Sequence, residues 1–537
     1  MTREITIEDL YRFKFVSRPR LSPDGRRVAF VVTTIDERAH AYRSAIWMMP
    51  VGADLSRPPA PYPYVGGPYN AQSPAWSPDG QWLAFVSDRE GEEQDKQHGK
   101  GKAQIWVLPT DGGEARQLTF MPHGANNPTW SHDGTRLLFS AQVGPLDEEF
   151  HDESGTHAGK PLPEARVIDR TFYRLDGTGF IYERRQHLFL IDVSSTINRE
   201  PTEPRQLTDG DWDDKDAAWS PDGQHIAFTS SRGEDRWHLP CADLYTLAIE
   251  DGQVGELRCL TDGTRNCVSP SWSPDGQSIA FLAARKYRSG GQVELFTIAA
   301  DGAPDSLYNL TADFEGSCAD WTNSDMTNEQ LRPPPAWSPD GQTLYALAVQ
   351  RGATRVYAVP ATGNMAVDDV AAQLIAPVTP GNIHALDFSL DAARRQMAVL
   401  IETPAHVAEI FMVSMDTAGE LRTPEHAPGQ PQGIAPTLDD ECVLRRLTTF
   451  NDALFAELTL TTPEYFLYTG ADGWPMDGWV LKPPGFDASR KYPLIVEIHG
   501  GPNTQYGYGF MHEMHMLAAQ GYICLLYTSD AADDLTR

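Results

Sequence analysis

One pattern of hydrophobic and polar positions recurs along most of the chain. An apolar residue, most often tryptophan, precedes Ser-Pro-Asp-Gly, and an alternating apolar segment follows. Proline presets φ, aspartate accepts hydrogen bonds from the turn backbone, and glycine adopts the positive φ that other residues avoid. Each copy therefore predicts a β-hairpin. Seven copies occur: "LSPDGRRVAF" at Leu21, "WSPDGQWLAF" at Trp76, "WSHDGTRLLF" at Trp130, "WSPDGQHIAF" at Trp219, "WSPDGQSIAF" at Trp272, "WSPDGQTLYA" at Trp337 and a degenerate "FSLDAARRQMAV" at Phe388.

Most units contain a second predicted hairpin. The segments that begin at Ile105, Leu244 and Leu295 have a strand, an Asp-Gly turn, another strand and then Leu-Thr. Two hairpins make a four-stranded blade, and seven units spaced mostly 51 to 65 residues apart predict an all-β seven-bladed β-propeller over residues 19–452. A linear array of unrelated hairpins is disfavoured because isolated hairpins are unstable in water.

One unit is longer than the others, with 89 residues between Trp130 and Trp219. The excess is acidic and predicts a solvated loop, although a loop on a propeller face can instead contact a substrate. His151, Asp152 and His157 lie in it, but their spacing matches no metal site, and no metal is expected. A proline-rich stretch at 423–441 in the last unit also predicts a loop.

Different patterns flank the repeats. Residues 1–18 predict a short helical segment, because Thr6 and Asp9 have capping-box spacing. Residues 453–523 contain strands broken by Asp-Gly turns, then the near-continuous apolar strand of "RKYPLIVEIHGGP", and then a helix of about ten residues that ends at Gly521. Strand, loop, helix and strand in this order indicate the opening of an α/β domain.

The loop His499-Gly500-Gly501-Pro502 carries the candidate chemistry. Glycines let backbone N–H groups approach a substrate carbonyl, and such donors stabilise the oxyanion of acyl transfer. Taken alone, the tetrapeptide also fits a bare structural turn. His499 is interpreted as positioning the loop, because the triad histidine of α/β-hydrolases comes last in chain order. His512, Glu513 and His515 do not form HExxH, and they are interpreted as a polar helix face.

The composition of the chain limits the classes of partner that it can bind and the compartment in which we expect it. The 537 residues include 44 Lys plus Arg and 74 Asp plus Glu, and the net charge of -30 argues against nucleic acid or an anionic membrane as a partner. The six cysteines form no CxxC pair, which favours a reducing compartment. The N-terminus lacks the apolar core of a secretory signal, and no apolar run approaches the ~18 residues of a membrane span. We therefore expect a cytoplasmic protein; its oligomeric state is not indicated.

These repeats, followed by "GWVLKPPGFDASRKYPLIVEIHGGP", resemble the prolyl oligopeptidase family of serine peptidases, and most closely its acylaminoacyl-peptidase branch. The resemblance covers Met1 to about Ile523. It implies a propeller that filters access to a Ser-Asp-His site, the N-terminal part of an α/β-hydrolase domain at 453–523, short peptide substrates and no cofactor. Related enzymes often have tyrosine at the position of His499, so the implied oxyanion donors are backbone N–H groups near Gly501.

The chain departs from the family at its end. It contains no Gly-x-Ser-x-Gly, and the resemblance implies that the triad lies beyond residue 537. The tail "CLLYTSDAADDLTR" resembles the read-through of a sequencing-library transposon end, so residues 524–537 are predicted to be non-native; a divergent native tail is the alternative. A truncated chain of this kind is expected to be inactive, with the strand Leu494–Ile498 lacking its sheet partners.

The sequence thus predicts a serine-type peptidase that hydrolyses short peptides. Two alternatives stay open. TolB-like propellers carry similar repeats and act as non-catalytic binding scaffolds, but they have no need of residues 465–523. An esterase of the same fold would use the same triad chemistry.

Overall fold

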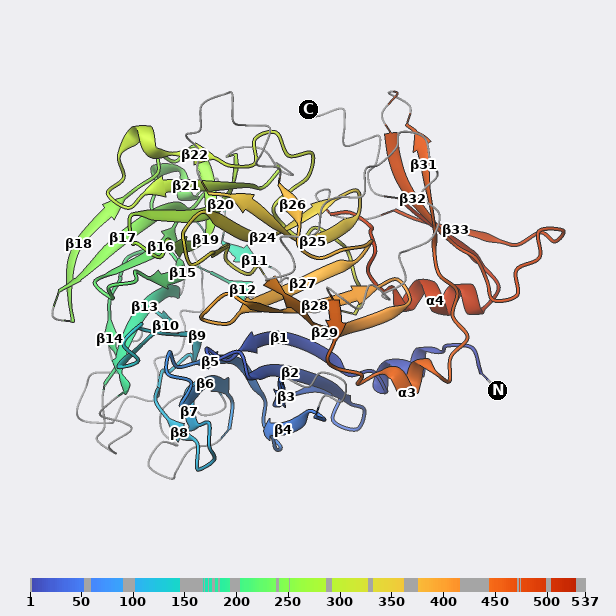
Figure 1. The fold of residues 1–537 in the computed structure, drawn as a ribbon, viewed down its shortest axis with the longest axis horizontal. Coiled ribbons are helices and arrows are strands. Elements are labelled where there is room, and N and C mark those ends of the chain that lie inside the picture. Colours follow the sequence, from blue (N-terminus) through green and yellow to red (C-terminus); the bar gives the residue numbers. More distant parts are fainter. Residues whose placement is uncertain are drawn as a thin grey trace. The chain divides into compact units, whose positions relative to one another are not determined.

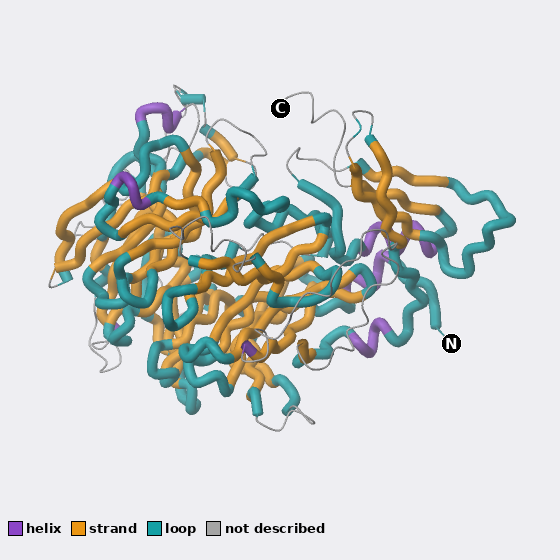
Figure 2. Tube along the Cα trace, turned by 45° about the horizontal axis from the view of Figure 1, so that its top comes forward, coloured by secondary structure: helices purple, strands orange, loops and turns teal. Residues whose placement is uncertain are grey.

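The computed structural model describes most of the chain. The described residues are 2–52, 59–89, 102–144, 168, 170–171, 173–175, 179–181, 184–193, 203–237, 241–250, 252–285, 292–326, 332–361, 375–415, 444–470, 473, 475–498 and 504–527. The chain forms two compact units. One comprises Met1–Pro74, Ser289–Leu295 and Asn309–Arg537, and the other comprises Ala75–Arg288 and Phe296–Tyr308. Strands dominate both (Figure 2).

Each repeated segment folds into four sequential strands (Figure 1). The first sheet contains β1 (Phe15–Leu21), β2 (Arg27–Asp36), β3 (Ala41–Pro50) and β4 (Tyr62–Val65). The second contains β5 (Ala71–Trp76), β6 (Trp82–Ser87), β7 (Gln104–Pro109) and β8 (Arg116–Gln117). The third contains β9 (Ala125–Trp130), β10 (Arg136–Val143), β13 (Arg185–Asp192) and β14 (Arg205–Gln206).

The later repeats follow the same plan. The fourth sheet contains β15 (Asp214–Trp219), β16 (His225–Ser230), β17 (Asp243–Glu250) and β18 (Gln253–Cys259), and the fifth contains β19 (Arg265–Trp272), β20 (Ser278–Arg285), β21 (Glu294–Ala299) and β22 (Tyr308–Asn309). The last two repeats contain β23 (Ala336–Trp337), β24 (Thr343–Gln350), β25 (Ala353–Pro360) and β26 (Ala376–Pro377), then β27 (His384–Leu390), β28 (Gln396–Thr403), β29 (His406–Ser414) and β30 (Leu444–Arg446). A single parallel pair, Thr354 with His384, joins these two into one eight-stranded sheet.

The Ser-Pro-Asp-Gly turns form through the hydrogen bonds that their residue types predict. In the fifth repeat, the Ser273 hydroxyl donates to Asp275 at 2.6 Å and accepts from the Ser278 N–H at 2.9 Å. Asp275 also accepts from the Gln277 N–H at 3.0 Å, and Gly276 has φ +70°. Hydrogen bonds from Ser273 and Gln277 hold the pKa of Asp275 below its ordinary value. The turn is therefore stabilised within six residues of chain.

The degenerate repeat forms the same turn two residues later than the sequence alignment predicts. Asp391, not Ser389, accepts the N–H of the residue five positions on, Gln396, at 3.0 Å. Arg394 occupies the glycine position with φ +57°. Matching Asp391 with the aspartate of Ser-Pro-Asp-Gly is therefore wrong. Its carboxylate takes the place of the serine hydroxyl as the acceptor, so Asp391 corresponds to the serine of the other repeats.

The Leu-Thr that ends most units has a structural reason. In the fifth repeat, the Thr311 hydroxyl accepts the Leu295 N–H at 2.9 Å, at the start of the third strand. Equivalent threonines accept a backbone N–H of the third strand in five other repeats: Thr119, Thr208, Thr261, Thr379 and Thr448. The hydroxyl satisfies a backbone donor that the short fourth strand leaves unpaired.

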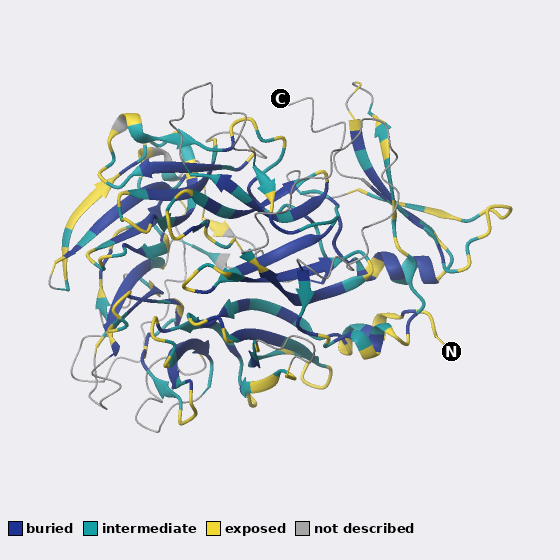
Figure 3. Cartoon of the chain, in the orientation of Figure 1, coloured by how far each residue is buried: buried dark blue, intermediate teal, exposed yellow. Residues whose placement is uncertain are grey.

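Apolar side chains pack between neighbouring sheets. In the first unit, Phe30 of β2 lies in one cluster with Leu400 of β28 and Ile410 of β29, so the first repeat packs against the last. The middle strands are buried, whereas the outer strand β18 is largely exposed (Figure 3). The acidic insertion contains the short hairpin β11 (Arg174–Leu175) and β12 (Gly179–Phe180), and its candidates His151, Asp152 and His157 lie outside the described residues.

The N-terminal segment forms a 3₁₀ helix, η1 (Ile7–Tyr11), rather than an α-helix. Its predicted capping contact is present, because Asp9 accepts the Thr6 N–H at 2.9 Å. The strand β1 begins at Phe15, inside the predicted segment 1–18. Two more 3₁₀ helices, η4 (Glu234–Trp237) and η5 (Pro304–Ser306), lie in the repeats. No helix of the described residues is long and apolar enough to cross a membrane.

After the repeats and the short helix α3 (Asp452–Phe455), the chain forms a mixed sheet. Its order is β31 (Glu464–Thr469), β32 (Pro475–Leu481), β34 (Ile523–Tyr527) and β33 (Leu494–Glu497). The pair β33–β34 is parallel. The helix α4 (His512–Ala519) packs on one face, where Trp479, Met514, Ala518 and Cys524 share an apolar cluster. This matches the predicted opening of an α/β domain.

Candidate functional site

The predicted oxyanion loop follows the end of β33. His499, Gly500, Gly501 and Pro502 lie outside the described residues, and the chain resumes at Thr504. Ligands of open α/β sheets bind beyond the carboxyl ends of parallel strands. Because β33 is parallel to β34, the loop leaves the sheet from such an end.

The strand before the loop has a sheet partner, which corrects one expectation. Leu494–Glu497 pairs in register with Ile523–Leu526, and Cys524 and Leu526 of that neighbouring strand are buried in the apolar cluster that includes α4. The predicted boundary at residue 524 therefore falls inside β34. The other face of β33 is open: Leu494, Val496 and Ile498 are 57%, 47% and 60% exposed. Parallel strands are normally covered on both faces, so this apolar face is unusual.

The chain that leaves the loop is paired with the segment between the fifth and sixth repeats. Gln505 forms a parallel bridge with Thr322: its N–H donates to the Trp321 carbonyl at 2.9 Å, and its carbonyl accepts the Asn323 N–H at 2.8 Å. The Asn323 amide also donates to the Thr504 hydroxyl at 3.2 Å.

The same segment supplies the cap of α4. Both carboxylate oxygens of Asp325 accept helix N–H groups, from His512 at 2.8 Å and from Glu513 at 2.7 Å. The residue at the helix N-cap position, Met511, provides no side-chain acceptor. A helix start needs acceptors for its first N–H groups, and here they come from 187 residues earlier in the chain.

The two histidines of α4 are buried, so their interpretation as a polar face is wrong. His512 and His515 are 4% and 3% exposed. The His512 Nε2–H donates to the Thr6 carbonyl at 3.1 Å, and the His515 Nε2–H donates to the Pro404 carbonyl at 2.8 Å. Burial lowers the pKa of His515 to about 4, so this ring is neutral. Hydrogen bonds to backbone carbonyls, which no local pattern encodes, allow both rings to be buried.

The segment that contacts Gln505 is also bonded to a charged cluster that the sequence did not indicate. The two ring nitrogens of His384 contact carboxylates, Nδ1 with Glu402 and Nε2 with Asp320, each at 2.7 Å. Burial alone would lower the pKa of His384, but the two carboxylates outweigh it and raise the pKa to about 10. Burial also opposes ionisation of Asp320, yet the imidazolium holds the pKa of Asp320 below its ordinary value.

This cluster cannot act as a catalytic base. With both nitrogens donating to carboxylates, His384 has no lone pair to accept a proton from a hydroxyl. Its ring is 1% exposed. The cluster is therefore structural.

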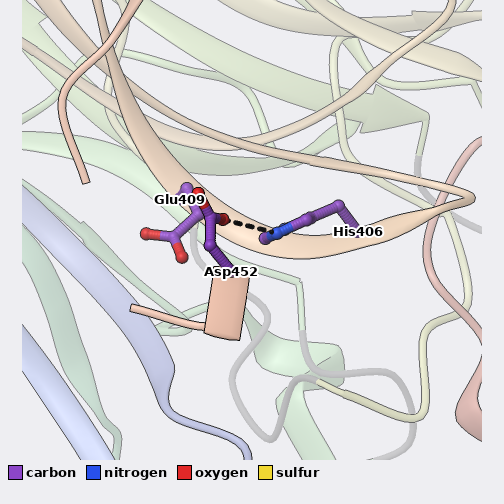
Figure 4. Close-up of side chains that lie close together, drawn as sticks. All are labelled: His406, Glu409 and Asp452. Carbon is purple, nitrogen blue, oxygen red and sulfur yellow. Dashed lines mark hydrogen bonds and ion pairs between the residues drawn. The ribbon is translucent and has the colours of Figure 1, made fainter. Parts of the chain in front are cut away.

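A second cluster has the donor types of a metal site. Side chains of His406, Glu409 and Asp452 converge within 4.8 Å of one another (Figure 4). The Arg446 guanidinium fills the same space: its Nη2 lies 2.5 Å from Asp452, 3.1 Å from His406 Nε2 and 3.6 Å from Glu409. A cation is already present where a metal would bind, so the arrangement is an arginine-centred ion cluster.

A small pocket lies between the mixed sheet and α4 in the first unit. Its lining includes Trp479, Tyr506, Met511, Met514 and His515. The rest of the lining is proline, leucine and glycine except for the amide of Asn323, and His515 is neutral, so the pocket offers packing rather than acid–base chemistry.

The curated proteins that are similar to this chain in sequence include peptidases. The "Uncharacterized peptidase YuxL" of Bacillus subtilis is 28% identical over 522 residues, which cover 97% of this chain and 70% of that protein. The "Dipeptidyl-peptidase 5" of Porphyromonas gingivalis is 24% identical over 525 residues, which cover 95% of this chain and 65% of that protein. The chain thus spans about two thirds of the length of these relatives.

Solved structures share the fold. An acylaminoacyl peptidase of Pyrococcus horikoshii matches with a TM-score of 0.65 and 20% identity, over 96% of this chain and 66% of that one. A Mycobacterium tuberculosis puromycin-hydrolyzing peptidase matches with a TM-score of 0.63 and 15% identity, over 98% and 68%. Residues 247–432 match the family described as "Lipoprotein LpqB beta-propeller domain". Together these findings confirm a β-propeller in this chain and a fold that it shares with solved peptidase structures.

Proposed function

Because the chain belongs to the prolyl oligopeptidase family, we propose that it forms the propeller and the first part of the hydrolase domain of a serine-type peptidase. Its substrates are short peptides, cleaved in the manner of an acylaminoacyl peptidase or a dipeptidyl peptidase. The propeller has seven blades and restricts access to the site. The enzyme is cytoplasmic and uses no cofactor.

One observation carries this proposal: the parallel pair β33–β34 follows the propeller directly, and the glycine loop leaves its carboxyl end. A propeller that only binds partners has no need of this sheet. The apolar face of β33, open at Leu494, Val496 and Ile498, supports a larger sheet domain in the whole enzyme.

The roles follow from the chemistry of acyl transfer. Backbone N–H groups near Gly501 stabilise the oxyanion, and His499 positions their loop. The serine nucleophile, histidine base and orienting aspartate come from chain outside these 537 residues, which contain no Gly-x-Ser-x-Gly. The 537-residue chain alone is therefore inactive.

A binding scaffold is the second candidate. It is favoured by the match of residues 247–432 to a lipoprotein propeller and by the missing nucleophile motif. An esterase would share the fold and the triad, and paired peptide and ester substrates would separate it from a peptidase.

Sequencing the source locus past the codon for Ile523 tests the proposal. We expect an open frame that reaches Gly-x-Ser-x-Gly, then aspartate, then histidine. A gene that ends at Arg537 would exclude catalysis and leave the scaffold.

A further inference from the structure

The segment Asp320–Met326, here called the docking segment, contacts the chain that follows the predicted oxyanion loop at successive residues. Thr322 pairs with Gln505 by backbone bridging, which fixes the register of that chain. The Ser324 hydroxyl donates to the Phe510 carbonyl at 3.3 Å. Met326 packs in one apolar cluster with Phe510 and Ala519. These contacts lie within one compact unit.

Asp325 adds the contact that orients α4. Its two oxygens accept the His512 and Glu513 N–H groups. Two acceptors on one planar carboxylate restrain both the position of the helix start and the direction of its axis. A negative charge at a helix N-terminus also interacts favourably with the helix dipole.

The docking segment is bonded at its first residue, Asp320, to the buried His384 cluster. Asp320 is bonded to the His384 imidazolium and accepts the Thr322 N–H at 3.0 Å. Gly509 lies close above the same cluster: a Cβ there would come within 2.7 Å of Glu402 and 3.1 Å of His384. The chain after the loop therefore packs directly on this charged cluster, and a side chain at position 509 would displace Glu402 or His384.

From this geometry we propose that Asp325 is a positioning residue for the peptidase reaction, which orients α4 and thereby the segment from Thr504 that leaves the predicted oxyanion loop. The inference rests on the proposed peptidase function. Oxyanion donors act only when they are held close to their productive geometry, and displacements of about 1 Å can cost ~100-fold in rate. Asp325 lies between the fifth and sixth repeats, so chain from the propeller helps to set the geometry of the segment after the predicted oxyanion loop.

The first test uses the 537-residue chain and amide hydrogen exchange in the segment His512–Ala519. Asp325→Ala is expected to speed this exchange roughly 2- to 30-fold, the range of a lost N-cap. Asp325→Asn keeps one acceptor and should restore much of the protection. Asp313→Ala is the matched control, because Asp313 is an exposed aspartate near the docking segment. Unchanged exchange in Asp325→Ala, or an equal rise in β27–β29, would overturn the proposal.

The second test uses the whole protein and a peptide substrate. Asp325→Ala should lower kcat about 10-fold or more with little change in KM, Asp325→Asn should recover most of the rate, and Asp313→Ala should match the unaltered protein. A normal kcat in Asp325→Ala, despite faster exchange in α4, would overturn the positioning role. If the unaltered protein cleaves no peptide, the proposed function fails, while the exchange result still decides whether Asp325 fixes α4.

Discussion

The Ser-Pro-Asp-Gly turns and the docking segment both depend on an aspartate that accepts two hydrogen bonds, yet only the turns are visible in the sequence. Asp275 bonds residues two positions away on either side. Asp325 bonds residues 187 and 188 positions away. Hydrogen bonds between residues of one turn require a short, recurring sequence motif. Hydrogen bonds between residues far apart in the chain require no such motif.

The largest effect is expected where the long-range contacts are charged. Asp320→Ala removes one carboxylate from His384, whose ring is 1% exposed, and should lower the free energy of unfolding by about 3 kcal/mol or more. Urea unfolding measures the change. The control Asp313→Ala should cost less than about 0.5 kcal/mol. Equal losses in the two variants would show that the buried cluster contributes no more than an exposed aspartate.

The same cluster predicts a pH dependence with a definite sign. The pKa of His384 is raised to about 10, so its contribution is complete below its unfolded pKa of about 6.5 and disappears as the pH rises through 10. The pKa of Asp320 is lowered, so its contribution is present above about pH 4 and is lost as the pH falls. The stability difference between the unaltered chain and His384→Gln should therefore be largest between about pH 4 and 6.5. A difference that grows from pH 7 to 10 would contradict the assignment.

A local turn should tolerate damage better. Ser273→Ala removes the donor to Asp275 and the acceptor of the Ser278 N–H, and it should cost about 1–2 kcal/mol. Denaturant unfolding of the variant gives the value. A cost above that of Asp320→Ala would reverse the comparison between local and long-range contacts.

The smallest effects come from backbone conformation alone. At Gly276, a Cβ would meet its nearest neighbour, in Pro221, at 3.7 Å, so Gly276→Ala tests the positive φ without a clash and should cost about 1 kcal/mol. Arg394 has φ +57° at the equivalent position, and its guanidinium donates to the Asp391 carbonyl at 3.3 Å. Arg394→Gly and Arg394→Ala both lose that hydrogen bond, so the glycine variant should be more stable than the alanine variant by about 1 kcal/mol, because only glycine adopts the positive φ without strain. Thermal unfolding compares the two; equal stability would contradict the revised alignment of this repeat.

The repeats could be predicted from the sequence because each unit encodes its own turns and its Leu-Thr ends. The degenerate copy was matched two residues out of register. Its Asp391 carboxylate accepts the backbone N–H that a serine hydroxyl accepts in the other repeats, and matching residue types cannot detect that change of acceptor. The mixed sheet and α4 were also predicted, since an apolar strand and a glycine-ended helix are local patterns. The partner of β33 was missed, because its pairing with β34 joins segments on opposite sides of α4.

The candidate site was only partly predictable. The glycine loop is a local motif with a chemical reason. The burial of His512 and His515, the carboxylates around His384 and the cap from Asp325 all depend on partners distant in sequence. The cluster around Arg446 could not be predicted either. Its histidine, glutamate and aspartate converge like metal ligands, but the Arg446 guanidinium lies between them and takes the place of a metal ion.

The central claim is that this propeller serves a serine peptidase, and labelling of the whole protein with a fluorophosphonate probe tests it most directly. The account predicts that the probe modifies one serine outside these 537 residues, that peptide hydrolysis stops on labelling, and that the 537-residue chain is not labelled. A whole protein that neither takes the label nor cleaves short peptides would contradict it.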